Sequence, residues 1–595
     1  MAEPISRRDL LKAAGIAAAL PLVAREAPGP RDAGPAQGRI LPLTSTSDVF
    51  VPPRGNAFQK FSFDFPEPSV EFEGLRFGFL VFSRENAYGL NAERMRVAAD
   101  GDAVVMTCDE LVWAGGQERA PGVVEARLRK NGEWIEWDVT ARMDQPIKAV
   151  TTVLRGVPRG KISVGGGGGG ADPHDDEVLI GYPFGAGDLF GGNTAWSAGT
   201  PLVVVQAREA EHFFLSSLDD RVRAKRFYFQ PGESGYRVEC VFEVEGWLVQ
   251  RSVSVPTWRA GRAATLDAAA QPHFDHLAKA YGFRRLAERA DAPAWLQDTA
   301  LVIALHGMHY SGYVFNDYAR MLEILRWVGG QVPGRRVLVF LPAWDGRYYW
   351  DYPLYRPAER LGGEAGFARL VHEGQQLGFR FMPMFGANAA NRRQAVFGRV
   401  ADAATAKIDG ESFDLDWVDW DNDRHEEGWL AYMNLGVDSW RNWLTGRIAE
   451  TVERYGVDAY FLDITGGWIN NPRADMHEGT RRLVADLRAS HPGVLACGEF
   501  LYDALAAFLP LHQVYWPRLA PYVRAFSHLS HPAPGRGSSG VHESGFGGFD
   551  PGTLSLARRE GLIPTLTVVD DTFAAHREEM VAVIRQAKVW AGIGS

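Results

Sequence analysis

The feature that most constrains the fold is a change of hydrophobic period near residue 296. After this point, short apolar runs typical of buried strands alternate with amphipathic helical patterns, at a spacing of roughly 40 residues. Parallel strands need a crossover between them, so this alternation predicts βα units around a parallel sheet. We expect the units to close into a (β/α)8 TIM-type barrel. The alternative is an open doubly wound sheet, but no G-x-G-x-x-G segment follows the first strand.

Seven strands of this barrel are visible, each as an apolar run that stops at a polar or aromatic residue. They lie in LVIALHG (301–307), RVLVFLPAW (336–344), FRFMPMFGAN (379–388), DAYFLDIT (458–465), VLACGEF (494–500), YVRAFSHL (522–529) and LIPTLTVVDD (562–571). An eighth strand is expected around residues 530–560.

The chain before residue 296 has a different pattern. Residues 40–272 contain many short segments that alternate apolar and polar side chains, with no long helical period between them. This pattern predicts a large antiparallel β-sandwich. Residues 273–295 read as a helical connector, and 296–595 as a catalytic barrel.

The first 39 residues are expected to be an export signal and a linker. The segment SRRDLLKAAGIAAALPLVA (6–24) places Arg7 and Arg8 before an apolar run too short to span a bilayer, and it resembles a twin-arginine signal. Leu10 stands where that signal usually has Phe. The resemblance implies a periplasmic or secreted protein, and no other segment is expected to span a membrane.

Charge and cysteine content exclude several function classes. The net charge of −10 argues against nucleic acid as a partner, because phosphate binding needs a basic face. Cys108, Cys240 and Cys497 are widely spaced and match no metal-binding pattern, so we expect them to be buried small apolar residues. No metal or cofactor is predicted.

The residues at the strand exits carry the predicted chemistry, because active sites of such barrels lie at the carboxyl ends of the strands. Acids and aromatics dominate there. The exit residues are His306, Trp344, Asp345, Asn388, Asp463, Glu499, His528, Asp570 and Asp571; Asp351, Tyr352 and Trp468 follow in the loops.

Asp463 and Glu499 stand out because they end two consecutive buried strands, where packing alone gives no reason for a carboxylate. Neither is followed at once by a helix that needs a cap. Two carboxylates on adjacent strands can cleave a glycosidic bond, one as nucleophile and the other as general acid and base. Flat aromatic side chains suit the apolar faces of sugar rings. We therefore expect an ionised Asp463 and a protonated Glu499, with their carboxyl groups roughly 5–6 Å apart.

The barrel half resembles the retaining glycoside hydrolases of the α-amylase superfamily. It is most similar to endo-α-N-acetylgalactosaminidase-like hydrolases, which carry a large sandwich before the barrel. The matching segments are YGVDAYFLD (455–463), CGEF (497–500), LVHEGQQLGFRFMPMFGAN (370–388), the Tyr-Pro loop after the second strand and, in the sandwich, FFLSSLDD (213–220). The resemblance implies Asp463 as nucleophile, Glu499 as acid/base, and an oligosaccharide, polysaccharide or glycoconjugate as substrate.

The same resemblance implies a third acid after a late strand, for which Asp570 and Asp571 are the candidates. The N-H-D triplet that usually accompanies this acid is absent from the chain here.

Two other functions stay open. A metal-dependent lyase also places acids at consecutive strand exits, but the barrel has only Lys407 and Lys588, neither at an exit, so His306 or His528 would have to be the base. A carbohydrate-binding protein on a barrel scaffold is the non-enzymatic alternative, and it would not need both Asp463 and Glu499.

The segment DLDWVDWDNDRHEE (414–427) resembles the start of an EF-hand loop through Asp419, Asp421 and Asp423. Arg424 occupies the position that requires glycine, so it is not an EF-hand. We expect an acidic loop over the barrel mouth, with Ca²⁺ binding as the alternative.

Overall fold

The structure is a computed structural model that describes most of the chain after residue 66. The described residues are 39–44, 67–164, 178–183, 195–232, 235–309, 311–406, 410, 412–414, 429–499, 501–514, 520–530, 561–569 and 572–593. The predicted export signal, nearly all of the acidic loop, and both Asp570 and Asp571 lie outside this set.

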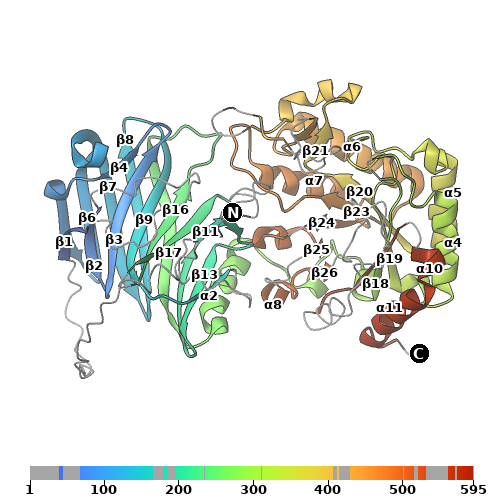
Figure 1. Cartoon of the computed structure of the whole chain (residues 1–595), viewed down its shortest axis with the longest axis horizontal. Coiled ribbons are helices and arrows are strands. Elements are labelled where there is room, and N and C mark those ends of the chain that lie inside the picture. Colours follow the sequence, from blue (N-terminus) through green and yellow to red (C-terminus); the bar gives the residue numbers. More distant parts are fainter. Residues whose placement is uncertain are drawn as a thin grey trace, which may run out of the picture.

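The first half of the chain is a sandwich of two facing layers (Figure 1). One layer runs in the order β1 (Arg39–Thr44), β2 (Glu67–Phe72), β3 (Leu75–Ser83), β9 (Ile147–Val157), β16 (Gly235–Glu243), β15 (Lys225–Gly232), β11 (Val178–Tyr182) and β12 (Ala195–Ser197). The other runs in the order β10 (Lys161–Val164), β13 (Leu202–Arg208), β14 (Glu211–Ser217), β17 (Ser252–Ala263), β8 (Trp134–Met143), β7 (Glu118–Asn131), β6 (Ala103–Trp113) and β5 (Met95–Asp100). Strand β4 (Ala87–Leu90) pairs with both β3 and β6 and so joins the layers.

Aromatic side chains fill the space between the two layers. Trp137 of β8 stacks on Trp258 of β17, with ring centroids 6.4 Å apart, and meets Phe77 of the opposite layer edge-on at 5.4 Å. The Trp137 indole also donates a 3.0 Å hydrogen bond to the Thr152 hydroxyl on β9. The predicted antiparallel sandwich is confirmed; among the described strands, β11 and β12 form a parallel pair at its edge.

The second half is a parallel barrel, as predicted. Its described strands, in order round the barrel, are β18 (Leu301–Leu305), β19 (Val337–Leu341), β20 (Arg380–Gly386), β23 (Ala459–Asp463), β24 (Leu495–Glu499), β25 (Leu511–Gln513), β26 (His528–Ser530) and β27 (Thr565–Val568). Strands β18 and β27 pair, and a parallel bridge between Ser530 and Ile563 closes the ring.

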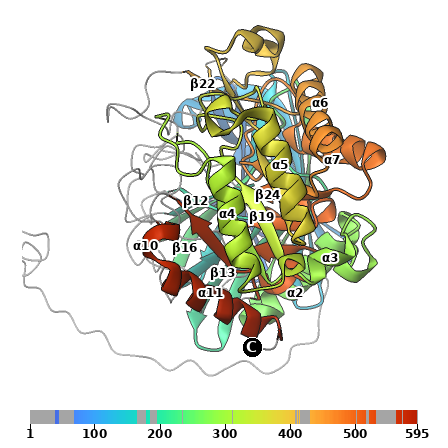
Figure 2. The ribbon, with the colours of Figure 1, turned by 90° about the vertical axis from the view of Figure 1, so that its right-hand side faces the viewer.

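Helices cover the outside of the barrel, and Figure 2 shows several of them side by side. Those with described bounds are α4 (Tyr318–Gly329), α5 (Gly363–Gln376), α6 (Asp438–Tyr455), α7 (Met476–Ser490), α8 (Ala520–Val523), α10 (Thr572–Ala575) and α11 (Arg577–Trp590). Asp317 and Asp475 cap α4 and α7, each accepting a hydrogen bond from a backbone amide of the first turn. Beyond the end of β20, strand β21 (Ala389–Asn391) pairs antiparallel with β22 (Leu430–Tyr432).

The sequence missed one strand. The structure places β25 at Leu511–Gln513, before the region where an eighth strand was expected. Three residues with a histidine in the middle carry too little apolar pattern to be recognised as a strand. The same error misplaced His528, which begins the seventh strand instead of ending the sixth and lies at the level of Cys497, below the barrel mouth.

A helix and a buried interface join the two halves. Helix α2 (Leu266–Ala280) begins before the predicted connector, contains Pro272, and packs against sandwich strands β13, β14 and β17. The ring of Phe274 stacks on Tyr522 of the barrel helix α8 with centroids 4.1 Å apart. The predicted boundary at residue 272 therefore falls inside a helix. The three cysteines are buried and free, as predicted.

Among the described residues, no helix combines the length and apolarity needed to cross a bilayer.

Candidate active site

Asp463 and Glu499 lie side by side at the carboxyl end of the barrel. They are the last residues of the adjacent parallel strands β23 and β24, and the pairing of Leu462 with Gly498 holds both acids at the same level. Both are buried, with exposed fractions of 2% for Asp463 and 9% for Glu499. The strands leading to them are buried at every position, as expected of parallel strands covered on both faces.

The two carboxyl groups form a hydrogen-bonded pair. Burial, together with the negative charge of Glu499, raises the pKa of Asp463 well above its ordinary 3.8. Two carboxyl groups in contact cannot easily both be ionised, so the pair holds one proton between them. The raised pKa of Asp463 opposes the permanent charge expected from the sequence, and the expected carboxyl separation of roughly 5–6 Å stays a prediction.

One oxygen of this pair is left without a partner. Asp463 Oδ2 is buried and makes no hydrogen bond to any described residue. An unsatisfied buried carboxylate oxygen is rare in folded proteins because it loses hydration without compensation. It is the oxygen that a reacting group can approach.

A strained turn directly after Asp463 sets the geometry of the pair. Ile464 has φ 57°, a left-handed conformation that β-branched residues seldom adopt. This turn directs the Ile464 amide at Glu499 Oε2, with an N···O distance of 2.8 Å. The Asn388 side chain donates to the Ile464 carbonyl at 2.9 Å. Asn388, predicted as a sugar ligand, therefore supports the turn that orients the acids.

A tyrosine from the second strand's loop contacts the pair. Tyr349 hydrogen bonds to Asp463, and this contact favours the ionised form and opposes the rise in its pKa. Tyr349 also lies 2.8 Å, hydroxyl to hydroxyl, from Tyr348. The Tyr349 hydroxyl therefore lies between Asp463 and the Tyr348 hydroxyl. Tyr349 has φ 58°, so a second left-handed residue faces the acids. Strain of this kind gathers at functional sites.

Trp344 does not lie in the site. Its side chain is fully buried, its indole donates a 2.9 Å hydrogen bond to the Met384 carbonyl, and its ring packs against Phe367 of α5 at 4.8 Å. The residue therefore fills the layer between sheet and helices. The prediction that Trp344 binds sugar is not supported by this placement, because the chain turns at Ala343, which has φ 51°.

The two aspartates after β19 have different environments. Asp351 accepts a 2.7 Å hydrogen bond from the Arg347 amide and so closes its own loop. Asp345 is buried, and its Oδ2 has no partner among the described residues. Burial, with a smaller contribution from the charge of Asp351, raises the pKa of Asp345 well above its ordinary range. Burial thus favours the protonated form of Asp345, which can donate a hydrogen bond. Tyr352 has a buried hydroxyl, also without a described partner.

The remaining predicted residues are buried near the strand exits. Trp468, in the loop after β23, is 1% exposed and its indole nitrogen has no partner among the described residues. Its neighbour Gly467 accepts a 2.9 Å hydrogen bond from the Tyr432 hydroxyl. His306, after β18, packs its ring against Phe315 at 5.1 Å, and burial lowers its pKa to about 3. It is therefore neutral at physiological pH.

Within the described ranges, no three His, Cys, Asp or Glu side chains gather closely enough to hold a metal ion. Asp414 belongs to the described part of the acidic loop and pairs with Arg392. The rest of that loop lies outside the described residues, so the predicted acidic loop over the barrel mouth and its alternative, Ca²⁺ binding, are not tested.

Sequence reasoning missed Tyr348, Tyr349 and Ile464. The Tyr pair was visible in the aromatic segment after β19, but nothing in a loop pattern says which ring reaches the next strands. Ile464 gave no signal, since an isoleucine after a strand predicts continued extended backbone.

Searches of the sequence against protein-family models and against curated proteins find no match. The fold, in contrast, is similar to solved structures. One is the α-N-acetylgalactosaminidase NagBb from Bifidobacterium bifidum in complex with GalNAc, with 13% identity over 90% of this chain and 91% of that chain and a TM-score of 0.65. The same protein in complex with Gal-NHAc-DNJ gives 14% identity, coverage of 89% and 90%, and a TM-score of 0.63.

A third similar structure is the GH36 α-galactosidase AgaA from Geobacillus stearothermophilus, with 10% identity, coverage of 95% of this chain and 86% of that chain, and a TM-score of 0.50. These likenesses cover both halves of the molecule. They show a shared architecture of a β-sandwich followed by a TIM-type barrel.

Proposed function

We propose that this protein is a retaining glycoside hydrolase that cleaves an α-linked glycosidic bond. The observation that carries the proposal is the contact between Asp463 and Glu499, buried at the ends of adjacent strands, with Asp463 Oδ2 unsatisfied. Inverting enzymes keep their carboxyl groups about 6.5–9.5 Å apart to admit a water molecule, and retaining enzymes keep them about 5–5.5 Å apart. Two carboxyl groups that interact directly on adjacent strands favour the shorter arrangement.

Asp463 is the nucleophile in this mechanism. In this proposal the proton of the pair is placed on Glu499, because the hydrogen bond with Tyr349 favours the ionised form of Asp463. Asp463 attacks the anomeric carbon, and Glu499 gives its proton to the leaving oxygen. A water molecule then enters, Glu499 takes its proton, and the water oxygen attacks the anomeric carbon. The bond to Asp463 breaks, and the sugar is released with its original configuration.

The substrate class follows from two further arguments. Similar structures bear the names α-N-acetylgalactosaminidase and α-galactosidase, which favours an α-linked N-acetylgalactosamine or galactose. Asp345, a buried acid whose Oδ2 has no partner among the described residues, is suited to hydrogen bond a sugar hydroxyl. The other proposed sugar contacts come from Trp468, Tyr352, Asp570 and Asp571. We also propose a relation to the amylase-like hydrolases.

The test is hydrolysis of a panel of aryl α- and β-glycosides that includes N-acetylgalactosaminides and galactosides. We expect turnover of an α-glycoside, with proton NMR showing an α-configured first product. A β-configured product would contradict the retaining mechanism. Sugar binding without any turnover would favour the carbohydrate-binding alternative.

We also propose export through the twin-arginine pathway, on the basis of Arg7 and Arg8 before a short apolar run. Replacement of both arginines by lysine is expected to leave the protein in the cytoplasm, measured by fractionation and immunoblotting. Unchanged export of the double variant would contradict this route.

A further inference from the structure

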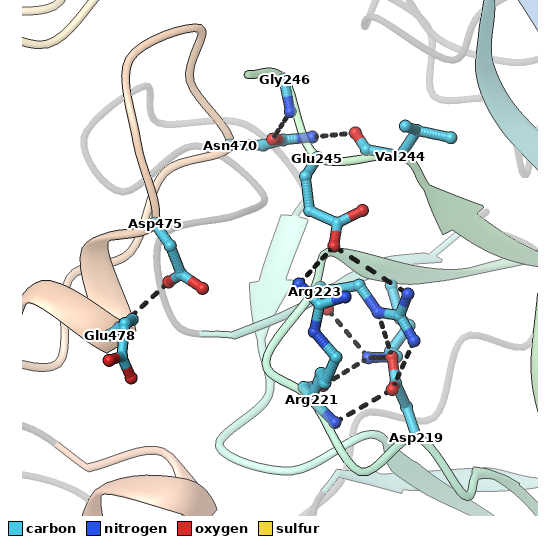
Figure 3. Close-up of polar contacts among 10 residues, drawn as sticks. Asp219, Arg221, Arg223, Val244, Glu245, Gly246, Asn470, Asp475 and Glu478 are labelled. Atoms are coloured by element: carbon cyan, nitrogen blue, oxygen red, sulfur yellow. Dashed lines mark hydrogen bonds and ion pairs between the residues drawn. The ribbon is translucent and has the colours of Figure 1, made fainter. Parts of the chain in front are cut away.

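The loop after β23 is bound by the sandwich through one buried side chain. Asn470, seven positions after the candidate nucleophile, accepts a 2.7 Å hydrogen bond from the Gly246 amide. Its amide group donates to the Val244 carbonyl at 2.9 Å (Figure 3). The same group donates to Glu243 at 3.3 Å. Both ends of the Asn470 amide are thus satisfied by a single turn of the other domain.

The sandwich turn that holds Asn470 is itself fixed. Glu245 lies between Val244 and Gly246, is 3% exposed on its side chain and pairs with Arg221 at 2.9 Å (Figure 3). A side chain at Gly246 would place its Cβ 2.6 Å from the Asn471 carbonyl oxygen, so only glycine allows this close approach. The two backbones are therefore in direct and well-defined contact.

The loop after β24 is bound to the sandwich in the same manner. Asp503, four positions after Glu499, is fully buried. Its carboxylate accepts hydrogen bonds of 2.7 Å from the Tyr182 hydroxyl and 2.7 Å from the Thr200 hydroxyl, and its amide donates to the Gly199 carbonyl at 2.7 Å. Both strands that carry a candidate catalytic acid are thus followed by a loop with a buried polar anchor in the other domain.

We propose that the β-sandwich positions the catalytic pair, with Asn470 and Asp503 as the positioning residues that transmit its rigidity to Asp463 and Glu499. The inference rests on the proposed glycosidase function. It goes beyond that function because it assigns the sandwich a part in catalysis.

The physical argument starts from the turn at Ile464. A left-handed β-branched residue persists only where surrounding contacts over-determine its conformation. The sheet fixes residues up to Asp463, but the amide that holds Glu499 belongs to the turn beyond it. Exit loops lie at the low-stability end of a structure unless tertiary contacts hold them. Asn470 supplies such a contact at the far end of the same loop.

The consequence is kinetic. Displacement of reacting groups by about 1 Å can lower a rate by about 10²-fold, without a matching change in substrate affinity. Loss of either anchor should therefore lower kcat while KM changes little. Loss of a merely structural contact would lower the active fraction and the melting temperature instead.

The test uses four variants of the full-length chain and one control. Asn470→Ala removes the barrel side of the first anchor, and Gly246→Ala disturbs it from the sandwich. Asp503→Ala removes the second anchor, whereas Asp503→Asn keeps an acceptor for the Tyr182 hydroxyl. Tyr522→Phe is the control, because it removes a different hydrogen bond between the halves, 2.9 Å to Asp267 on α2.

We expect kcat per active site, titrated with a covalent inactivator, to fall about 10²-fold in the Asn470 and Gly246 variants, with KM within about threefold of wild type. Asp503→Ala should show a similar fall that Asp503→Asn largely restores. The Tyr522 control should keep its kcat. A fall confined to the titrated active fraction, with normal kcat, would overturn the proposal.

A second measurement keeps this inference separate from the proposed function. Amide hydrogen exchange over residues 464–475 needs no substrate and should accelerate in Asn470→Ala and Gly246→Ala but not in the Tyr522 control. Unchanged exchange would overturn the anchoring itself. If wild type cleaves no glycoside while exchange accelerates as expected, the glycosidase proposal fails and the anchoring stands.

Discussion

Among the described strand ends of the barrel, carboxyl groups are buried in two places, one after β19 and the other at the ends of the adjacent strands β23 and β24, and their surroundings differ. After β19, Asp345 is buried alone while Asp351 closes its own loop. After β23 and β24, Asp463 and Glu499 hydrogen bond to each other. Burial raises the pKa of a carboxyl group at both exits, but only the second exit brings two groups close enough to share a proton. Proximity between neighbouring strands, and not burial alone, makes a candidate catalytic pair.

The largest effect is expected from Asp463→Asn. The amide cannot attack the anomeric carbon, so turnover should fall by roughly 10⁴-fold, on the order of the loss of an enzyme nucleophile. The matched control is Asp351→Asn at the other exit, which should lower activity far less. Equal losses in the two variants, measured with an aryl α-glycoside, would remove the distinction between the exits.

Glu499→Gln should slow the reaction by about 10²–10⁴-fold on substrates with poor leaving groups, the usual contribution of a general acid or base. Substrates with good leaving groups need no acid, so the glycosyl-enzyme should still form and accumulate. Azide, which attacks without a general base, is expected to restore turnover and yield a glycosyl azide. Absence of rescue would argue against Glu499 as the acid/base.

Tyr349→Phe removes the hydroxyl group that favours the ionised form of Asp463. A hydrogen bond to a charged group contributes about 1.5–3 kcal/mol, so turnover at neutral pH should fall by about tenfold or more. Loss of this bond raises the pKa of Asp463, because the ionised form loses a donor. The acid limb of the kcat/KM profile should therefore move to higher pH. An unmoved limb would show that Tyr349 does not act on the nucleophile.

The smallest effect on turnover, and a measurable one on stability, is expected of Asp503→Asn. Burial raises the pKa of Asp503 from 3.8 to about 6. A group with a raised folded-state pKa contributes stability below its unfolded pKa and loses it as pH rises through the folded value. The wild-type melting temperature should therefore fall between about pH 4 and pH 6 relative to that of Asp503→Asn, whose amide does not titrate.

The buried histidines contribute equally to the pH dependence of stability in the wild type and in Asp503→Asn. Their contribution therefore cancels in the difference between the two melting temperatures. Calorimetry of the two proteins across this pH range gives the comparison directly. Melting temperatures that change with pH in the same way in both proteins would contradict the raised pKa of Asp503.

Much of the barrel could be predicted because its strands are buried on both faces and therefore read as apolar runs. Seven of them were found, and β25 was not, since its three residues carry too weak a pattern. Trp344 was misplaced for a related reason. The alternation of side chains along a strand predicts the direction of each side chain only within the strand. The backbone turns at Ala343, directly before Trp344, so the alternation no longer applies there.

The sequence by itself determined that two acids end consecutive buried strands, because a carboxylate at the end of an apolar run has no packing reason to be there. It also determined the two halves of the chain, through their different hydrophobic periods. The tertiary structure decided that the acids touch and that Asp463 has a raised pKa. It also decided that Tyr349 reaches Asp463 and that the sandwich holds both exit loops. These contacts join residues far apart in the chain through turns such as that at Ile464, whose conformation depends on surrounding contacts and not on local sequence.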